Sequence, residues 1–212
     1  MSSPLPHALP YGLRDVKLTP YTDATATQLD TANQVDLPVS RTLTFSETEE
    51  FTQLEGDDEV VATHGAGPQV EWELEAGGIS LKAWSVLTGG TYTEADTTTG
   101  TPRILKKKAS DQRPYFKIEG QVISDSGGDI HCEIFRAKCN DTLEGEFTYG
   151  EFMVTSCSGV GYGSQYADEA TGVEIGDLYR FTQNPTVTPI ENGGAAAQSL
   201  DVEPDATEVP IG

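Results

Sequence analysis

Four residues of the sequence have the chemistry of metal ligands. His131, Cys132, Cys139 and Cys157 together supply the nitrogen and sulfur donors that zinc prefers. Their spacing argues against a site, because no Cys-x-x-Cys pair is present and because neighbours such as His131 and Cys132 point to opposite faces of a strand. An odd number of cysteines inside apolar runs favours reduced, buried thiols instead. We therefore expect neither a metal nor another cofactor.

The sequence also lacks the motifs of common catalytic sites. The three histidines are His7 in an expected N-terminal arm, His64 beside a turn at Gly65, and His131, and no nucleophile-elbow motif accompanies them. The 34 acidic residues leave a carboxylate pair of the glycosidase type open, but no acid lies in an apolar pocket pattern. The glycine-rich stretch 159–163 lacks the helix and the lysine of a phosphate loop, so we expect a turn there. We predict that the protein is not an enzyme.

The net charge narrows the classes of partner. Against the 34 acids stand only 13 Lys and Arg residues in 212, which gives a formal net charge of -21. Such a chain gains no affinity for nucleic acid from counterion release and is repelled by anionic membranes. The first residues lack a basic start followed by an apolar run, so we expect no signal peptide. No stretch approaches the roughly 18 apolar residues of a membrane-spanning helix.

The charges are segregated along the chain. Between Thr42 and Leu81 there are ten acids and no Lys or Arg, whereas the short stretch from Arg103 to Lys117 holds six of the basic residues and a single acid, Asp111. The ten acids are Glu47, Glu49, Glu50, Glu55, Asp57, Asp58, Glu59, Glu71, Glu73 and Glu75. Complementary patches of this kind can steer two copies of a chain into register. A charge match within one chain, or two solvated loops, would give the same pattern.

The elements that carry these residues are predicted to be strands. The region 113–157 contains three apolar runs of strand length separated by turn sequences, which indicates successive hairpins. In the middle run the apolar phase slips by one residue between Ile134 and Phe135, which predicts a β-bulge. Residues 69–76 alternate strictly, with Glu71, Glu73 and Glu75 on the face toward water.

The remaining pattern predicts an all-β domain with one helix. Further strands are expected at 15–19, 39–45, 60–63 and 178–182. A short amphipathic helix is expected at 80–88, with Ser80 as N-cap and Gly89-Gly90 as the exit. Residues 91–112 are predicted to form a polar connection. We expect one domain over residues 1–190, which includes an N-terminal arm, and a C-terminal arm over residues 191–212 that orders only with a partner.

The order of these features resembles that of the major tail tube proteins of long-tailed, siphovirus-type bacteriophages, particularly those of actinobacterial hosts. The resemblance extends from Tyr11 to Pro189. It is most specific from Val70 to Gly90, where a strand leads through Gly-Gly into a short helix that ends in Leu-Thr-Gly-Gly. It is also carried by the stretches LPYGLRDVKLTPY, RPYFKIEGQVISDSGGDIHCEIFRAKC and DLYRFTQNPTVTPI.

The resemblance implies a β-sandwich or small barrel flanked by one helix, with extended arms. Six copies would form a ring whose hairpins join into an inner barrel, and rings would stack into a tube through which the genomic DNA is ejected into the host. The implied partners are further copies of the chain, the tape measure protein, and the tail terminator and distal tail proteins. Double-stranded DNA would pass without specific binding, and no membrane is involved. The protein would be made in the host cytoplasm and reside in the virion.

The resemblance also assigns roles to the charged residues. The candidate acids for the lumen are the ladder Glu71, Glu73 and Glu75 on one strand and Glu119 on another, and the sequence leaves the choice between these two faces open. The candidates for charge contacts, either between subunits of a ring or between stacked rings, are Arg103, Lys106, Lys107, Lys108 and Arg113 on one side, and Glu47, Glu49, Glu50, Asp57, Asp58 and Glu59 on the other. Two alternatives remain: another virion component, such as a tail terminator or capsid decoration protein, or a secreted carbohydrate-binding β-sandwich. The lack of a signal peptide and of an exposed aromatic row argues against the second.

Overall fold

The computed structural model describes residues 8–37, 39–56, 59–78, 80–141, 149 and 154–190. Strands dominate this part of the chain, and none of its helices is long and apolar enough to cross a membrane. The helical elements are η1 (Thr31–Asn33) and α1 (Leu81–Thr88). The strands are β1 (Pro10–Pro20), β2 (Val35–Asp36), β3 (Ser40–Thr48), β4 (Phe51–Gly56), β5 (Glu59–Gly65), β6 (Gln69–Gly77), β7 (Thr91–Thr93), β8 (Ile104–Lys106), β9 (Phe116–Ser124), β10 (Asp129–Cys139), β11 (Val154–Tyr162) and β12 (Tyr179–Asn184).

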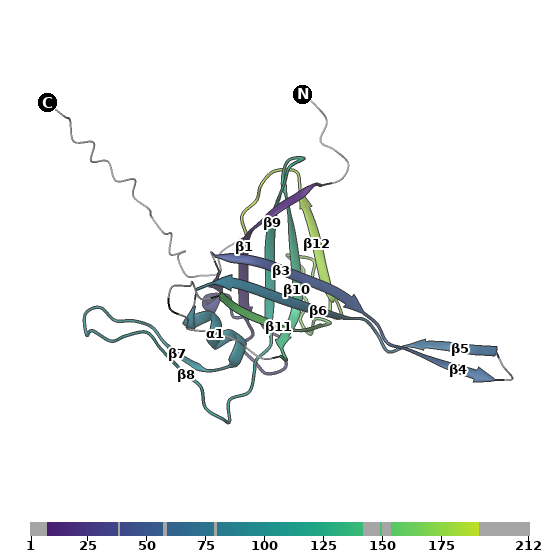
Figure 1. Ribbon diagram of the computed structural model, residues 1–212, viewed down its shortest axis with the longest axis horizontal. Helices are drawn as coiled ribbons and strands as arrows, with labels where there is room; N and C mark the ends of the chain where they lie inside the picture. The colour runs from purple at the N-terminus through teal and green to yellow at the C-terminus, as the bar shows by residue number, and fades with distance from the viewer. Residues whose placement is uncertain are drawn as a thin grey trace.

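Eight of these strands form one antiparallel sheet that folds over into two layers (Figure 1). The order is β2-β1-β9-β10-β11-β6-β3, and β12 also pairs with β10. β10 is the corner strand, because its first half pairs with β12 and its last four residues pair with β11. Its ladder with β9 shifts register between Ile134 and Ala137, so the predicted bulge is confirmed. A bulge bends the strand and increases its twist, which lets one strand belong to both layers.

The core lies between the two layers, and the all-β prediction is confirmed. Val16 and Ile118 of one layer and Val70 and Leu74 of the other belong to one buried cluster. The ring centroids of Trp72 and Phe116 lie 5.6 Å apart in an edge-on arrangement. Fully burying a side chain of this size contributes about 1.5–3 kcal/mol. The sheet does not close into a barrel, since β3 pairs only with β6 among the described strands.

Helix α1 covers one side of the core and forms where it was predicted. The Ser80 side chain accepts a hydrogen bond from the backbone N–H of Ala83, which caps the first turn. Gly89 ends the helix in the left-handed conformation at φ 78°. Only glycine fits there, because a Cβ would also collide with the carbonyl of Gln112. The buried side chains of α1 are Ala83, Val86 and Leu87.

The stretch 159–163, expected to be a turn, belongs to a strand as far as Tyr162, so that expectation is wrong. Gly159 and Gly161 lie in β11 between β10 and β6. A Cβ on Gly161 would approach the Ile134 side chain to 2.6 Å, and one on Gly159 would approach the Trp72 ring to 2.6 Å. These glycines therefore leave room for the bulky side chains of neighbouring strands, a role that glycine often has inside a sheet.

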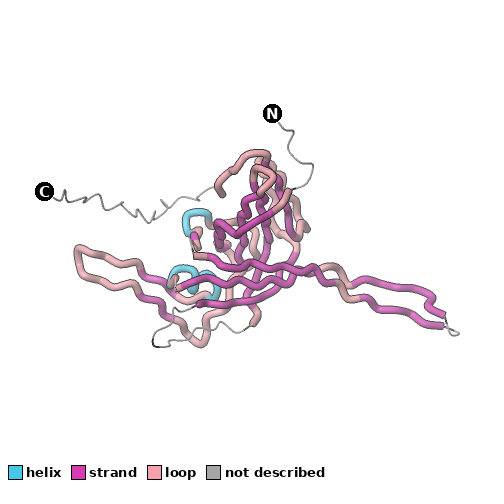
Figure 2. The backbone as a smooth tube through the Cα atoms, turned by 45° about the horizontal axis from the view of Figure 1, so that its top comes forward, coloured by secondary structure: helices cyan, strands magenta, loops and turns pink. Residues whose placement is uncertain are grey.

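Two hairpins leave the sandwich at opposite ends of the long axis (Figures 1 and 2). The β4–β5 hairpin extends the β3–β6 pair beyond the sheet. The β7–β8 ribbon lies beside α1 and occupies part of the predicted connection 91–112. Strand β1 begins at Pro10, earlier than predicted. Most of the predicted N-terminal arm, with His7, and all of the arm 191–212 lie outside the described residues.

Candidate functional site

The acidic ladder of β6 lies on the outer face of the second layer. Glu71 and Glu73 are exposed and Glu75 is half-buried, while the residues between them are buried. Their cross-strand neighbours on β3 and β11 are mainly serine and threonine, and Thr42 donates a hydrogen bond to Glu75 at 3.3 Å. No Lys or Arg of the described residues forms an ion pair with the three glutamates. The face therefore carries uncompensated negative charge.

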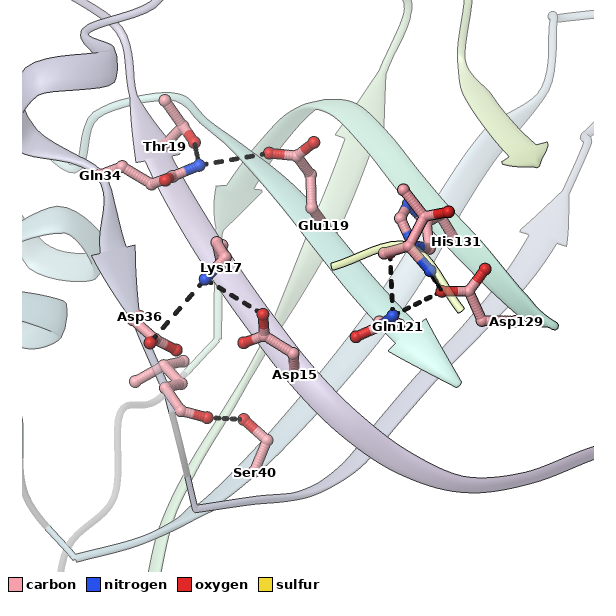
Figure 3. Close-up of polar contacts among 12 residues, drawn as sticks. Asp15, Lys17, Thr19, Gln34, Asp36, Ser40, Glu119, Gln121, Asp129 and His131 are labelled. Atoms are coloured by element: carbon pink, nitrogen blue, oxygen red, sulfur yellow. Dashed lines mark hydrogen bonds and ion pairs between the residues drawn. The ribbon is translucent and has the colours of Figure 1, made fainter. Parts of the chain in front are cut away.

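Glu119, the fourth candidate lumen acid, lies in a different environment. It belongs to β9 in the other layer, where its carboxylate is 3.0 Å from Lys117 Nζ. It also accepts a long hydrogen bond from Gln34 at 3.5 Å, which Figure 3 draws. Its side chain is only 17% exposed. The four candidates thus divide into an open ladder of three and one carboxylate already paired within the chain.

Glu119 is part of a buried polar face that the sequence did not reveal. On the outer side of β1, β9 and β10, Lys17 and Lys117 are almost fully buried. Lys17 Nζ lies 3.0 Å from Asp15 and 3.8 Å from Asp36, and Lys117 lies 2.7 Å from Glu133 (Figure 3 draws the part around Lys17). Each buried cation therefore has two carboxylates, which limits the desolvation penalty of burying charge.

Glu133 is the most highly connected group of this face. Its carboxylate binds Lys117 at 2.7 Å and accepts a charge-assisted hydrogen bond from Arg180 Nε at 2.5 Å. Burial raises the pKa of Glu133, but the Arg180 hydrogen bond and the Lys117 charge outweigh burial and leave the pKa below its ordinary value. The Lys117 pKa is lowered by burial but raised by more through Glu119 and Glu133. Glu133 and Lys117 are therefore both charged at neutral pH.

Asp129 anchors the segment that follows β12. It is fully buried and accepts hydrogen bonds from Gln121 at 2.5 Å, Asn184 at 2.8 Å and the backbone N–H of Thr188 at 2.8 Å. The Nε2 of His131 lies 3.2 Å from the same carboxylate (Figure 3) and 2.8 Å from the Thr188 carbonyl oxygen. These contacts hold residues 185–190 on the sandwich.

The cysteines have the environment of structural thiols. Cys132, Cys139 and Cys157 are free and buried, and burial raises the pKa of Cys132 and Cys157 to about 12. Thiols of this kind stay protonated at neutral pH and are weak ligands and nucleophiles. Across the described residues, no group of three or more His, Cys, Asp or Glu has a metal-binding arrangement.

The predicted basic contacts lie on the β7–β8 ribbon and the loop after it. Arg103 pairs with Glu94 at 2.8 Å, and Arg113 donates to the backbone carbonyls of Cys139 and Asp141. Lys107 donates to the carbonyl of Thr88 and so binds the ribbon to the C-terminus of α1. Arg103, Lys106, Lys107 and Lys108 are all exposed to solvent, whereas Arg113 is half-buried.

The predicted acidic contacts lie at the base of the β4–β5 hairpin and along it. Glu49 and Glu50 are exposed between β3 and β4, and Glu47 accepts a hydrogen bond from the Tyr179 hydroxyl at 2.7 Å. Glu59 begins β5, and Asp57 and Asp58 lie outside the described residues. The hairpin and the basic ribbon project from opposite ends of the molecule, so the fold does not bring these two charge clusters together within one chain (Figures 1 and 2).

An aromatic cluster is present where none was expected. Phe45 of β3 packs against Phe181 of β12 at 5.0 Å, and Tyr179 packs against Phe181 at 5.6 Å. All three side chains are exposed. The expectation of no exposed aromatic row therefore needs correction, although the rings meet at 49° and 69° and do not form the flat platform on which a sugar ring stacks. The cluster was missed because Phe45 and Phe181 come from opposite ends of the chain.

Comparison with models of known protein families gives no match, and a search of characterised proteins gives none either.

Proposed function

We propose that the protein is a structural subunit of a bacteriophage tail tube, in which hexameric rings stack around a channel for DNA. The observation that carries this proposal is the open sheet with a hairpin projecting from each end of the molecule. Exposed strand edges and projecting hairpins are a liability in a monomer, and they are satisfied when identical copies cover them. The tape measure, tail terminator and distal tail proteins are the further partners that this role implies.

The charge of the molecule suits a channel for DNA. Glu71 and Glu73 stand exposed on a face without a basic partner among the described residues, and the whole chain carries a formal net charge of -21. A negative wall repels the phosphate backbone, so a duplex can slide along it without being held. We assign the β6 ladder, rather than Glu119, to the wall, because Glu119 is already paired with Lys117.

Negative-stain microscopy of the purified full chain over a range of concentrations tests the proposal. Tubes or stacked six-fold rings are expected. Single rings that never stack would point to the tail terminator alternative, and particles that remain monomeric at every concentration would contradict assembly altogether.

A reconstruction of the tube tests the assignment of the lumen. We expect the channel to be lined by Glu71, Glu73 and Glu75. A channel lined chiefly by Lys and Arg would contradict the proposed passage of DNA, because a basic wall binds the phosphate backbone.

A further inference from the structure

The β4–β5 hairpin carries three large apolar side chains in water. Phe51 is 61% exposed, Leu54 is 63% exposed and Val61 is 66% exposed. Leu54 pairs with Ala62, which places it on one face of the hairpin, and the alternation places Phe51 on the other. A two-stranded hairpin cannot bury apolar groups by itself. Something outside the hairpin must therefore cover them if they are to leave water.

An apolar cavity of about 250 Å³ lies at the other end of the same β3–β6 pair. It opens between the C-terminal end of β6 and helix α1, and its walls include Val39, Leu74, Ala76, Ala83, Trp84 and Leu87. Val39 is 54% exposed at its margin. The cavity has no charged residue in its lining and offers room for one or two aliphatic side chains.

The charges beside the hairpin and beside the cavity are of opposite sign. The hairpin has Glu49 and Glu50 exposed at its base. Helix α1 has the basic ribbon at its C-terminus, where Lys107 donates to the carbonyl of Thr88 and Lys108 is exposed. An apolar projection with acids beside it thus matches an apolar cavity with bases beside it, and such matching favours one docking register.

We infer that the β4–β5 hairpin of one copy docks into the cavity beside α1 of a neighbouring copy. The inference rests on the proposed function, because the occupant is a second copy of this chain. Within one chain the hairpin points away from α1, so it does not fill its own cavity (Figures 1 and 2). Projection and cavity lie on different surfaces, so the contact is heterologous and repeats from copy to copy, as rings and tubes require. β4 has six residues, which reach about 20 Å from the sandwich.

Photo-crosslinking tests the contact directly. The full chain carries p-benzoylphenylalanine in place of Leu54, and a mixture of isotopically light and heavy protein is irradiated under assembly conditions. We expect crosslinks between copies to residues 74–87, identified by mass spectrometry. The same probe at Leu9, which is 46% exposed and lies before β1, is the matched control and should not reach that segment. Crosslinks from position 54 to any other surface would overturn the inference.

A pair of valine variants tests the energetics. Val61→Ser should raise the concentration needed for assembly about tenfold, because one aliphatic side chain no longer leaves water. Val187 lies outside the hairpin and is 52% exposed, so Val187→Ser should leave the concentration needed for assembly unchanged. An unchanged thermal unfolding temperature shows that both variants fold. Tubes that form equally well from the Val61→Ser protein would reject the docking while the proposed function stands, whereas wild-type protein that never assembles would reject both.

Discussion

At the level of single residues, the feature that most distinguishes this chain is its buried ionic layer. Lys17 and Lys117 are cations in a protein with few cations, and both are buried beside carboxylates. The aromatic ring of Phe135 covers the same layer, with Lys117 Nζ 5.8 Å and the Arg180 guanidinium 5.6 Å from its centroid. Shielding from water strengthens these interactions and makes the loss of any one partner costly.

Replacing Glu133 tests this layer. Glu133→Gln removes the charge that Lys117 and Arg180 share, so we expect a loss of about 3–5 kcal/mol in the free energy of unfolding. Chemical denaturation followed by circular dichroism measures it. The control is Glu169→Gln, an exposed site at which a change within about 0.5 kcal/mol is expected. Equal stability of the two variants would show that the layer contributes nothing.

The same residue predicts a dependence on pH. The pKa of Glu133 is lower in the folded protein than its ordinary value of 4.5, so its stabilising effect is complete above that value. The effect is lost as the pH falls through the folded pKa, because the protonated carboxyl no longer carries charge. We therefore expect the stability difference between wild type and Glu133→Gln to be constant from pH 7 to about 6 and to shrink below 4.5. A difference that does not change with pH would contradict the ion pair.

At the level of elements, β11 shows how a strand can be built on glycine. Its buried face is formed by Thr155, Cys157, Gly159 and Gly161. The two glycines let the strand pass under Trp72 and Ile134, which fill the space that side chains of β11 would otherwise occupy. The cost in strand propensity is offset by the packing of these larger neighbours.

Gly159→Ala tests this packing. The added methyl group meets the carbonyl of Lys138 and the Trp72 ring, and the backbone contact cannot be relieved by a side-chain rotation. We expect a loss of about 1–3 kcal/mol in stability, together with a change in tryptophan fluorescence. Ser156→Ala, on the opposite face of the same strand, is the control and should change stability much less. A Gly159→Ala protein with the stability and the tryptophan fluorescence of the wild type would mean that β11 is less tightly packed than the structure indicates.

At the level of the whole molecule, the acidic and basic stretches that are separate in the sequence also lie far apart in the structure. The acidic β4–β5 hairpin and the basic β7–β8 ribbon lie at opposite ends of the long axis (Figure 1). A match between these clusters within one chain, which the sequence left open, is therefore not how the fold uses them. In the proposed tube, contacts between copies would bring the two clusters together.

Charge reversal at the ribbon tests this polarity. Lys108→Glu should weaken assembly and reduce its dependence on salt, because one attraction between copies becomes a repulsion. The control is Arg14→Glu, which makes the same change in net charge at an exposed position of β1. Sedimentation velocity at low and high salt measures both. Identical behaviour of the two variants would remove the basic ribbon from the interface.

The sequence alone determined the features that depend on near neighbours along the chain. The alternation of β6, the caps of α1 and the bulge of β10 follow from side-chain period and backbone preference over a few residues, and each was predicted close to its position. Only the tertiary structure decided that Gly159 belongs to a strand, that Lys117 is buried, and that Phe45 meets Phe181. The physical reason is that each of these depends on a partner distant in sequence, because register and packing, rather than local preference, bring such residues together.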